Sequence, residues 1–187
     1  MKKKLLIFIA IVLTVGFLGY TSMVGAQADN PIDITWELNS KDIEKISLIG
    51  AEQDVKVEIL ETEKEKTSIT LSGMVSQKGK EQLEETVQKE NSLEIKLSEI
   101  NKLRFMISSE DKDRLTLVLA LGKDILLNEL NINSVIGTVY IIVPKSFDGK
   151  YTLNTNDEGE ILEMPETNKT TDTEIIVDTL GDIGVTK

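Results

Sequence analysis

The chain has 187 residues, carries 21 Lys and Arg against 32 Asp and Glu, and contains no His and no Cys. Without these two residue types it cannot form a Cys/His zinc site, a Ser-His-Asp triad, a Cys nucleophile or a disulfide framework. The formal charge of −11 argues against a sequence-independent nucleic-acid binder, which needs a basic surface to displace counterions from phosphates.

The N-terminal segment has the order of a targeting sequence. Lysines at positions 2–4 precede an apolar run, residues 5–18, and an Ala26-Gln27-Ala28 sequence follows before Asp29. This order is typical of a secretory signal peptide. Extended to residue 24, the run has about 20 moderately apolar residues, so an uncleaved membrane anchor is the alternative. In both cases residues 1–28 form a segment of their own and the remainder is expected to be exported.

Alternation of apolar and polar residues dominates the rest of the chain. This period of two is typical of strands with one buried face. It predicts strands at residues 34–38, 45–48, 55–59, 69–71, 93–97, 104–107 and 115–121. The run 115–121 is apolar on both faces, which predicts a place in the interior of the sheet system.

One segment has helical spacing. Residues 80–90 place Leu83 and Val87 four apart among good helix formers, which predicts one short surface helix, with a charged loop as the alternative. The charged residues 108–114 predict a solvated turn.

The C-terminal third contains a regular spacing of glycines. Gly137, Gly159 and Gly181 are 22 residues apart, and a β-branched residue follows each glycine two positions later. A small polar residue precedes each glycine by three positions, namely Ser134, Asn156 and Asp178. The pattern predicts an internal repeat of strand, polar-Gly turn and strand.

Each repeat unit is too short to bury its own apolar face, so it must stack on the next unit. The glycine would supply a positive φ or a close backbone approach at the corner. The residues expected to point inward are Ile132, Val139, Leu153, Ile161, Ile176 and Ile183. This favours a β-solenoid or a curved, sandwich-like sheet, and unrelated hairpins of equal length are the alternative.

The repeats resemble those of the bacterial putative adhesin domain family, an exported β-repeat family of unknown function. The resemblance is carried by residues 50–59, 134–139, 156–161 and 178–183, and it spans most of residues 45–187. Only the last unit has the complete Gly-Asp-Ile sequence, at Gly181.

The resemblance implies an envelope location, no established catalytic residues and a right-handed parallel β-helix. The expected fold is therefore an all-β, solenoid-like repeat domain with one short helical insertion, preceded by an N-terminal signal or anchor helix. We expect a linker with the first strand at 29–44 and the adhesin-like repeat domain at 45–187.

Side chains with oxygen ligands surround Gly159, superficially as in a calcium loop: Asn154, Asn156, Asp157, Glu158 and Glu160. An EF-hand counted from Asn154 would place Pro165 where a bidentate Glu is needed, so that match fails. A loose calcium site is the alternative to a solvated turn, which we favour. We therefore predict no metal and no cofactor.

Two aromatic residues are candidates for surface contacts. Trp36 fits a core residue better than a contact residue. Tyr140 follows the inward Val139 on an alternating strand and is expected to face outward.

The sequence is compatible with three functions. The first is a non-catalytic exported envelope protein that presents an acidic, adhesin-like surface to an unknown envelope protein or polymer, with a link to the envelope stress response. The second is a membrane-anchored accessory subunit, and the third is a carbohydrate-active enzyme with paired carboxylates. We favour the first and expect no catalysis, no nucleic-acid partner, and membrane contact only through the N-terminal segment.

Overall fold

The computed structural model describes residues 28–98, 114–156 and 159–187. The predicted strand 104–107, almost all of the predicted turn 108–114, and residues 1–27 of the signal or anchor segment lie outside these residues. The described part consists mainly of strands with one short helix, which confirms the all-β prediction.

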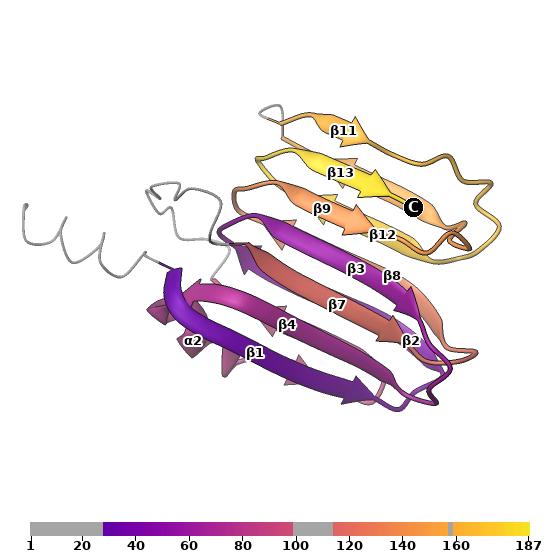
Figure 1. Ribbon diagram of the computed structural model, residues 1–187, viewed down its shortest axis with the longest axis horizontal. Helices are drawn as coiled ribbons and strands as arrows, with labels where there is room; N and C mark the ends of the chain where they lie inside the picture. Colours follow the sequence, from indigo (N-terminus) through magenta and orange to yellow (C-terminus); the bar gives the residue numbers. More distant parts are fainter. Residues whose placement is uncertain (1–27, 99–113, 157–158) are drawn as a thin grey trace, which may run out of the picture.

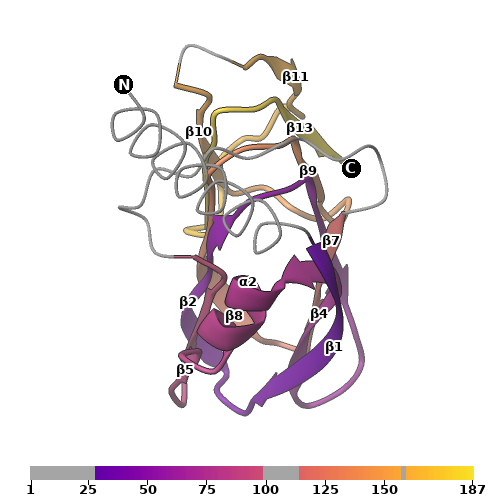
Figure 2. The same cartoon turned by 90° about the vertical axis from the view of Figure 1, so that its left-hand side faces the viewer.

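Within the described residues the strands form two sheets that pack face to face (Figures 1 and 2). The seven-stranded sheet contains, in spatial order, β1 (Ala28–Leu38), β4 (Thr67–Ser76), β7 (Leu115–Leu121), β3 (Val55–Glu61), β9 (Val139–Ile142), β13 (Ile183–Thr186) and β11 (Ile161–Glu163). The six-stranded sheet contains, in spatial order, β10 (Lys150–Asn154), β12 (Glu174–Asp178), β8 (Leu126–Ser134), β2 (Asp42–Ala51), β6 (Ser92–Lys96) and β5 (Val87–Gln88). The region expected to hold a linker therefore contains β1 and the start of β2.

Most neighbouring strands are parallel because the chain crosses from one sheet to the other between most consecutive strands; β3 and β4, and likewise β5 and β6, stay within one sheet. We call a strand of the six-stranded sheet and the strand of the seven-stranded sheet that follows it a rung. The rungs are β2–β3, β6–β7, β8–β9, β10–β11 and β12–β13 in the described part of the chain. Antiparallel pairs join β1 to β4, β4 to β7 and β5 to β6.

The spatial order of the rungs differs from their order in the chain. The last rung in the sequence, β12–β13, lies between β8–β9 and β10–β11. Both sheets are open and mix parallel with antiparallel pairs. The predicted right-handed parallel β-helix is therefore wrong, because such a helix would add its rungs one after another along the chain.

The core between the sheets is built from cross-strand rows of apolar residues. One row contains Ile95, Leu48, Ile132, Val177 and Leu153, and the facing row contains Leu115, Val55, Val139, Ile183 and Ile161. Ile132, Val139 and Ile183 are buried as predicted. The inward residue of β12 is Val177 and not Ile176, because the turn before Gly181 is one residue shorter than the turn before Gly137.

The strand β7 is buried on one face only. Leu115, Leu117 and Leu119 are completely buried, whereas Val118 on the opposite face is partly exposed. β7 does lie inside its sheet, between β4 and β3. This interior position agrees with the prediction for residues 115–121, although no further layer of the described residues covers the outer face of the strand.

The helix α2 (Gln77–Leu83) begins three residues earlier than predicted. The Ser76 hydroxyl accepts a hydrogen bond from the Gly79 N–H at 3.0 Å, which caps the first turn. Leu83 is buried, but Val87 belongs to β5 and is exposed. The helix contacts β1, β4 and β6, and Figure 2 shows it between the two sheets.

Candidate functional site

The three regularly spaced glycines form a column at one corner of the stacked rungs. A Cβ atom added to Gly159 would lie 2.1 Å from the Gly181 carbonyl oxygen, and one added to Gly181 would lie 2.2 Å from the Gly137 carbonyl oxygen. Gly137 has a φ of +95°, and a Cβ atom added to it would lie 2.6 Å from the Gln53 carbonyl carbon. The close approach of successive turns therefore requires residues without a side chain here.

The polar residues predicted before these glycines are not equivalent in space. The register places Thr179, and not Asp178, level with Ser134. Ser134 donates its hydroxyl to the Ile136 carbonyl at 2.8 Å, and Thr179 donates its hydroxyl to the neighbouring turn at 3.1 Å. Asp178 instead ends β12 and accepts from the Asn156 amide at 2.7 Å. Turns of different length shift the polar residue by one position.

Two aspartates that the sequence reasoning did not single out cap the glycine column. The Asp182 carboxylate accepts from the Glu160 N–H at 2.9 Å, and the Asp54 carboxylate accepts from the Thr138 N–H at 2.8 Å. Each aspartate thus satisfies a backbone donor on the next rung. The Asp182 of the Gly-Asp-Ile sequence in the last unit is the sequence feature that could have indicated this capping role.

At one end of the stack, the last strand of the six-stranded sheet is β10 and the last strand of the seven-stranded sheet is β11. No described strand continues either sheet beyond this rung, so we call this end open. The Lys150 N–H and the Asn154 carbonyl both bond toward β12. Backbone groups in a parallel ladder alternate in direction with a period of two. The N–H and C=O groups of Tyr151 and Leu153 therefore point outward, away from β12. Among the described strands, β10 therefore has a regular edge without a partner.

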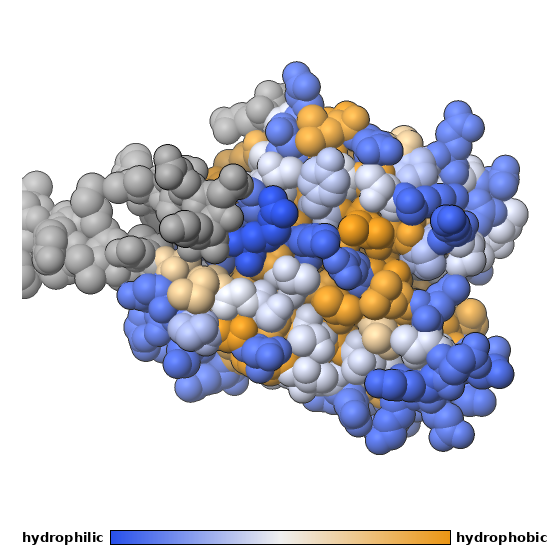
Figure 3. All heavy atoms as spheres, in the orientation of Figure 1, coloured by the Kyte–Doolittle hydropathy of each residue, from blue (hydrophilic) through white to orange (hydrophobic). Residues whose placement is uncertain are grey.

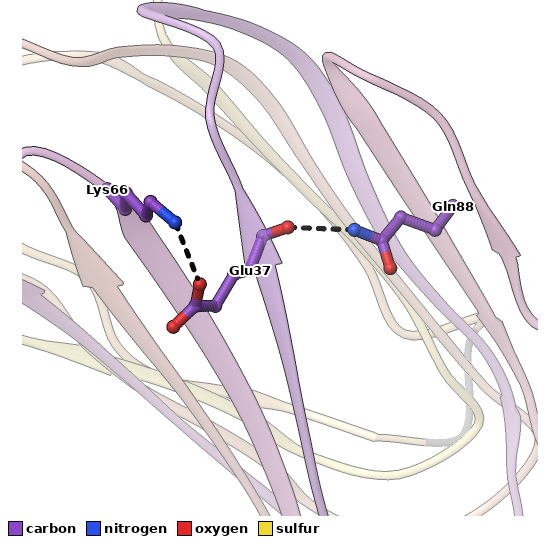
Figure 4. A network of polar contacts seen from close by, with 3 residues as sticks. All are labelled: Glu37, Lys66 and Gln88. Carbon is purple, nitrogen blue, oxygen red and sulfur yellow. Dashed lines mark hydrogen bonds and ion pairs between the residues drawn. The ribbon is translucent and has the colours of Figure 1, made fainter.

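The opposite end is closed by antiparallel strands, α2 and polar contacts between the sheets. In Figure 4 the Lys66 ammonium lies 3.3 Å from the Glu37 carboxylate, and the Gln88 amide donates to the Glu37 carbonyl at 2.7 Å. Gln88 lies in β5 and Glu37 in β1, so this network joins the outermost strands of the two sheets.

The open end also exposes apolar side chains. Ile161, Leu162 and Met164 are 50%, 51% and 53% exposed. Figure 3 shows apolar residues at the surface along the upper edge of the seven-stranded sheet, where β11 lies. We call Tyr151, Leu153 and these three residues the open-end surface.

Tyr140 and Trp36 lie in different surroundings. Tyr140 is 39% exposed on the outer face of the seven-stranded sheet, where its ring packs against Gly184 of the neighbouring strand. Trp36 is partly buried and packs against the core from β1. Tyr140 is therefore a surface residue of β9, which β13 separates from β11, and Trp36 lies near the closed end.

The Tyr151 side chain points inward from β10. Its ring centroid lies 5.3 Å from that of Phe147, and its hydroxyl is buried with no hydrogen-bond partner in the described part of the chain. Burial raises the pKa of Tyr151 to about 12, and the negative charge of Asp148 adds to this shift.

Tyr151→Phe is expected to stabilise the protein by about 1 kcal/mol at pH 7, because it removes a buried hydroxyl that lacks a partner. The wild type should lose stability from pH 10 to pH 12. A folded-state pKa of about 12 lies above the unfolded value of about 10, so the unfolded state ionises first. Urea unfolding across this range should show a smaller loss in Tyr151→Phe. Tyr140→Phe, at a side chain that is 39% exposed, is the control and should leave the stability at pH 7 unchanged.

Hydrogen bonds and charge hold two carboxylates in their anionic form. The Asp148 carboxylate accepts from the Thr170 hydroxyl and the Asn168 N–H, both at 2.5 Å, which lowers its pKa. The Lys45 ammonium lies 2.7 Å from the Glu129 carboxylate and lowers the Glu129 pKa. Asp148 thereby fastens the segment between β11 and β12 to the turn before β10.

The described residues contain no cluster of three or more His, Cys, Asp or Glu with the geometry of a metal site. Two of the oxygen ligands considered for calcium, Asp157 and Glu158, lie outside the described residues. Across the same described ranges, no helix is both long enough and apolar enough to span a membrane.

No family model and no curated protein matches the chain. Solved structures do show similarity. A putative cell adhesion protein from Clostridium sporogenes is 12% identical, with a TM-score of 0.37 over 84% of this chain and 99% of the other.

Two proteins from Parabacteroides distasonis are also similar. One, a putative adhesin, is 13% identical with a TM-score of 0.33, and the match covers 87% of this chain and 68% of that one. The other, a putative lipid binding protein, is 16% identical with a TM-score of 0.32, and 83% of this chain matches 52% of its length.

Proposed function

We propose that the chain is a non-catalytic, exported binding module of the cell envelope that contacts its partner through the open-end surface. The observation that carries this proposal is the asymmetry of the stack. One end is closed by antiparallel strands, a helix and interstrand polar contacts. At the other end, within the part of the chain that the structure describes, the strand edges are unpaired and the apolar side chains are half exposed. Stacked β-proteins normally cover their terminal strands, and uncovered edges pair readily with other chains.

The chemistry of the side chains supports a binding role. The sequence has no His and no Cys, which are the commonest general bases and nucleophiles. A glycosidase acid needs a carboxyl group whose pKa is raised. The shifts of Glu129 and Asp148 are both downward, so these groups fit structural anions better than catalytic acids.

Export is supported by the N-terminal sequence. Lysines 2–4, the apolar run 5–18 and the Ala26-Gln27-Ala28 sequence have the order that export machinery recognises. Cell fractionation with an antibody to the protein tests this part of the proposal. The protein should be found in the envelope or the medium, and recovery from the cytoplasm would contradict it.

Leu162→Lys tests the binding surface, since a charge on β11 opposes strand pairing and apolar contact. The protein purified from its producing cells should co-sediment with isolated envelopes, and Leu162→Lys should weaken this binding at least tenfold. Leu60→Lys is the matched control, because Leu60 is 45% exposed in the same sheet but outside the open-end surface. Equal binding by both variants and the wild type would contradict the proposal.

A further inference from the structure

We infer that the partner at the open-end surface is a second copy of this chain, docked with its β10 antiparallel to the first β10. This inference rests on the proposed function, since it names the occupant of the same surface; the envelope binding expected above is then binding to copies of this chain that the envelope carries. The two six-stranded sheets would continue across the contact as one sheet. A two-fold axis perpendicular to the sheet, passing between the two Thr152 residues, relates the copies.

The backbone of β10 has the polarity that this two-fold contact requires. The groups of Lys150 and Asn154 are bonded toward β12, so the groups that point outward belong to Tyr151 and Leu153. When Thr152 faces its own copy, Tyr151 lies opposite Leu153 of the second copy, and Leu153 lies opposite the second Tyr151. Directly opposed residues in an antiparallel ladder alternate between bonded and non-bonded pairs. The two Thr152 residues then form the non-hydrogen-bonded pair at the axis. On each side of it, Tyr151 of one copy and Leu153 of the other exchange two backbone hydrogen bonds.

The side chains also match in this register. On the outer face Thr152 meets Thr152, which is a favourable cross-strand pair. Within each chain the Thr152 hydroxyl donates to the Glu174 carboxylate at 2.7 Å, so the two threonines meet through side-chain contact and not through a mutual hydrogen bond. On the inner face Tyr151 and Leu153 cover each other, and both are only partly buried in the single chain. The contact therefore completes the core row at its exposed end.

The charges of the edge are complementary across the same axis. Lys150 lies opposite Asn154 of the second copy, and Asn154 is the register neighbour of Asp178. Each Lys150 thus points toward the Asp178 carboxylate of the other copy, and no like charges oppose each other along β10. Lys45 and Glu129 form a comparable cross-strand ion pair at 2.7 Å within this sheet.

The second sheet contributes apolar contact at the same junction. Because the two sheets pack face to face, the axis that joins the two β10 strands brings β11 opposite β11 of the second copy. Ile161 and Leu162 are half exposed there, so burial of both on each copy adds a hydrophobic contribution. β11 has only three residues and an irregular register, so the regular backbone pairing is assigned to β10.

Single-cysteine variants test the register, because the natural sequence has no Cys that could react. In a non-hydrogen-bonded antiparallel pair the Cα atoms are about 4.5 Å apart, which a disulfide can bridge. Thr152→Cys in the protein purified from its cells should therefore form a linked dimer under mild oxidation. Asn154→Cys is the matched control on the same face, and its two copies would be about 13 Å apart. We expect Thr152→Cys to link at least tenfold faster.

Sedimentation equilibrium tests the association without a cross-link. The wild type should form dimers, and Thr152→Lys, which places two ammonium groups in direct opposition, should shift the protein to monomers. Thr35→Lys, an exposed substitution near the closed end, should leave the dimer intact. A monomeric wild type, or equal linking by the two cysteine variants, would overturn the inference. If Leu162→Lys still abolished envelope binding in that case, the proposed function would stand with a different partner.

Discussion

Gly181→Ala is expected to destabilise the protein by about 3 kcal/mol or more. The added Cβ would lie 2.2 Å from the Gly137 carbonyl oxygen, and a contact this short with backbone cannot be relieved by a side-chain rotation. The rung that contains Gly181 is held on both sides, by β8–β9 and by β10–β11. Relief would have to separate β13 from β9, at the cost of packing and hydrogen bonds.

Gly159→Ala is the control for this effect. Its added Cβ would lie as close to a backbone oxygen, 2.1 Å from Gly181, but Gly159 belongs to the outermost rung, which can move outward. We expect a loss of about 1 kcal/mol, near the average for point substitutions. Urea unfolding followed by the fluorescence of Trp36, the only Trp in the sequence, measures both variants. Equal losses would contradict the placement of β12–β13 inside the stack.

Leu117→Ala should cost 2 to 5 kcal/mol, roughly the range observed when a buried leucine is truncated. Leu117 is completely buried at the centre of β7, between β4 and β3, where the strands on both sides limit collapse into the cavity. The midpoint of urea unfolding, with an unchanged slope, reports the loss.

Val118→Ala is the matched control for Leu117→Ala, one residue away on the opposite face of the strand. Val118 is partly exposed, so we expect a change below about 1 kcal/mol. A large loss at Val118 would mean that another layer covers the outer face of the seven-stranded sheet, and would contradict the one-sided burial of β7.

Local patterns predicted the strands well because period-two alternation depends only on which face of a strand is buried. Val55, Val57 and Ile59 are buried on β3, and Leu93 and Ile95 on β6, as their spacing indicates. The helix was placed too late because its start depends on the Ser76 cap, whereas the thin stripe of Leu83 and Val87 pointed further along the chain. Val87 lies in a strand and not in the helix because it pairs with β6.

The spatial order of the rungs was beyond the reach of such patterns. Each unit has the same apolar face, so any order of stacking buries the same residues, and a sequential order is the simplest expectation. The actual order depends on which edge fits β12 best, and on backbone contacts such as that of Gly181 with Gly137. The open-end surface escaped prediction for the same reason, because an edge strand cannot be identified before the order of strands is known.

The position of β12–β13 has a consequence for biogenesis. The ribosome makes Glu174–Asp178 and Ile183–Thr186 after β10 and β11, yet these late segments occupy interior positions beside β8 and β9. Until they emerge, β10–β11 has no permanent neighbour, and the nascent polypeptide cannot close its sheets from one end to the other. We therefore expect folding to finish with the insertion of these two strands, and a chain that ends before Glu174 would have a gap in the interior instead of being a shorter version of the same protein.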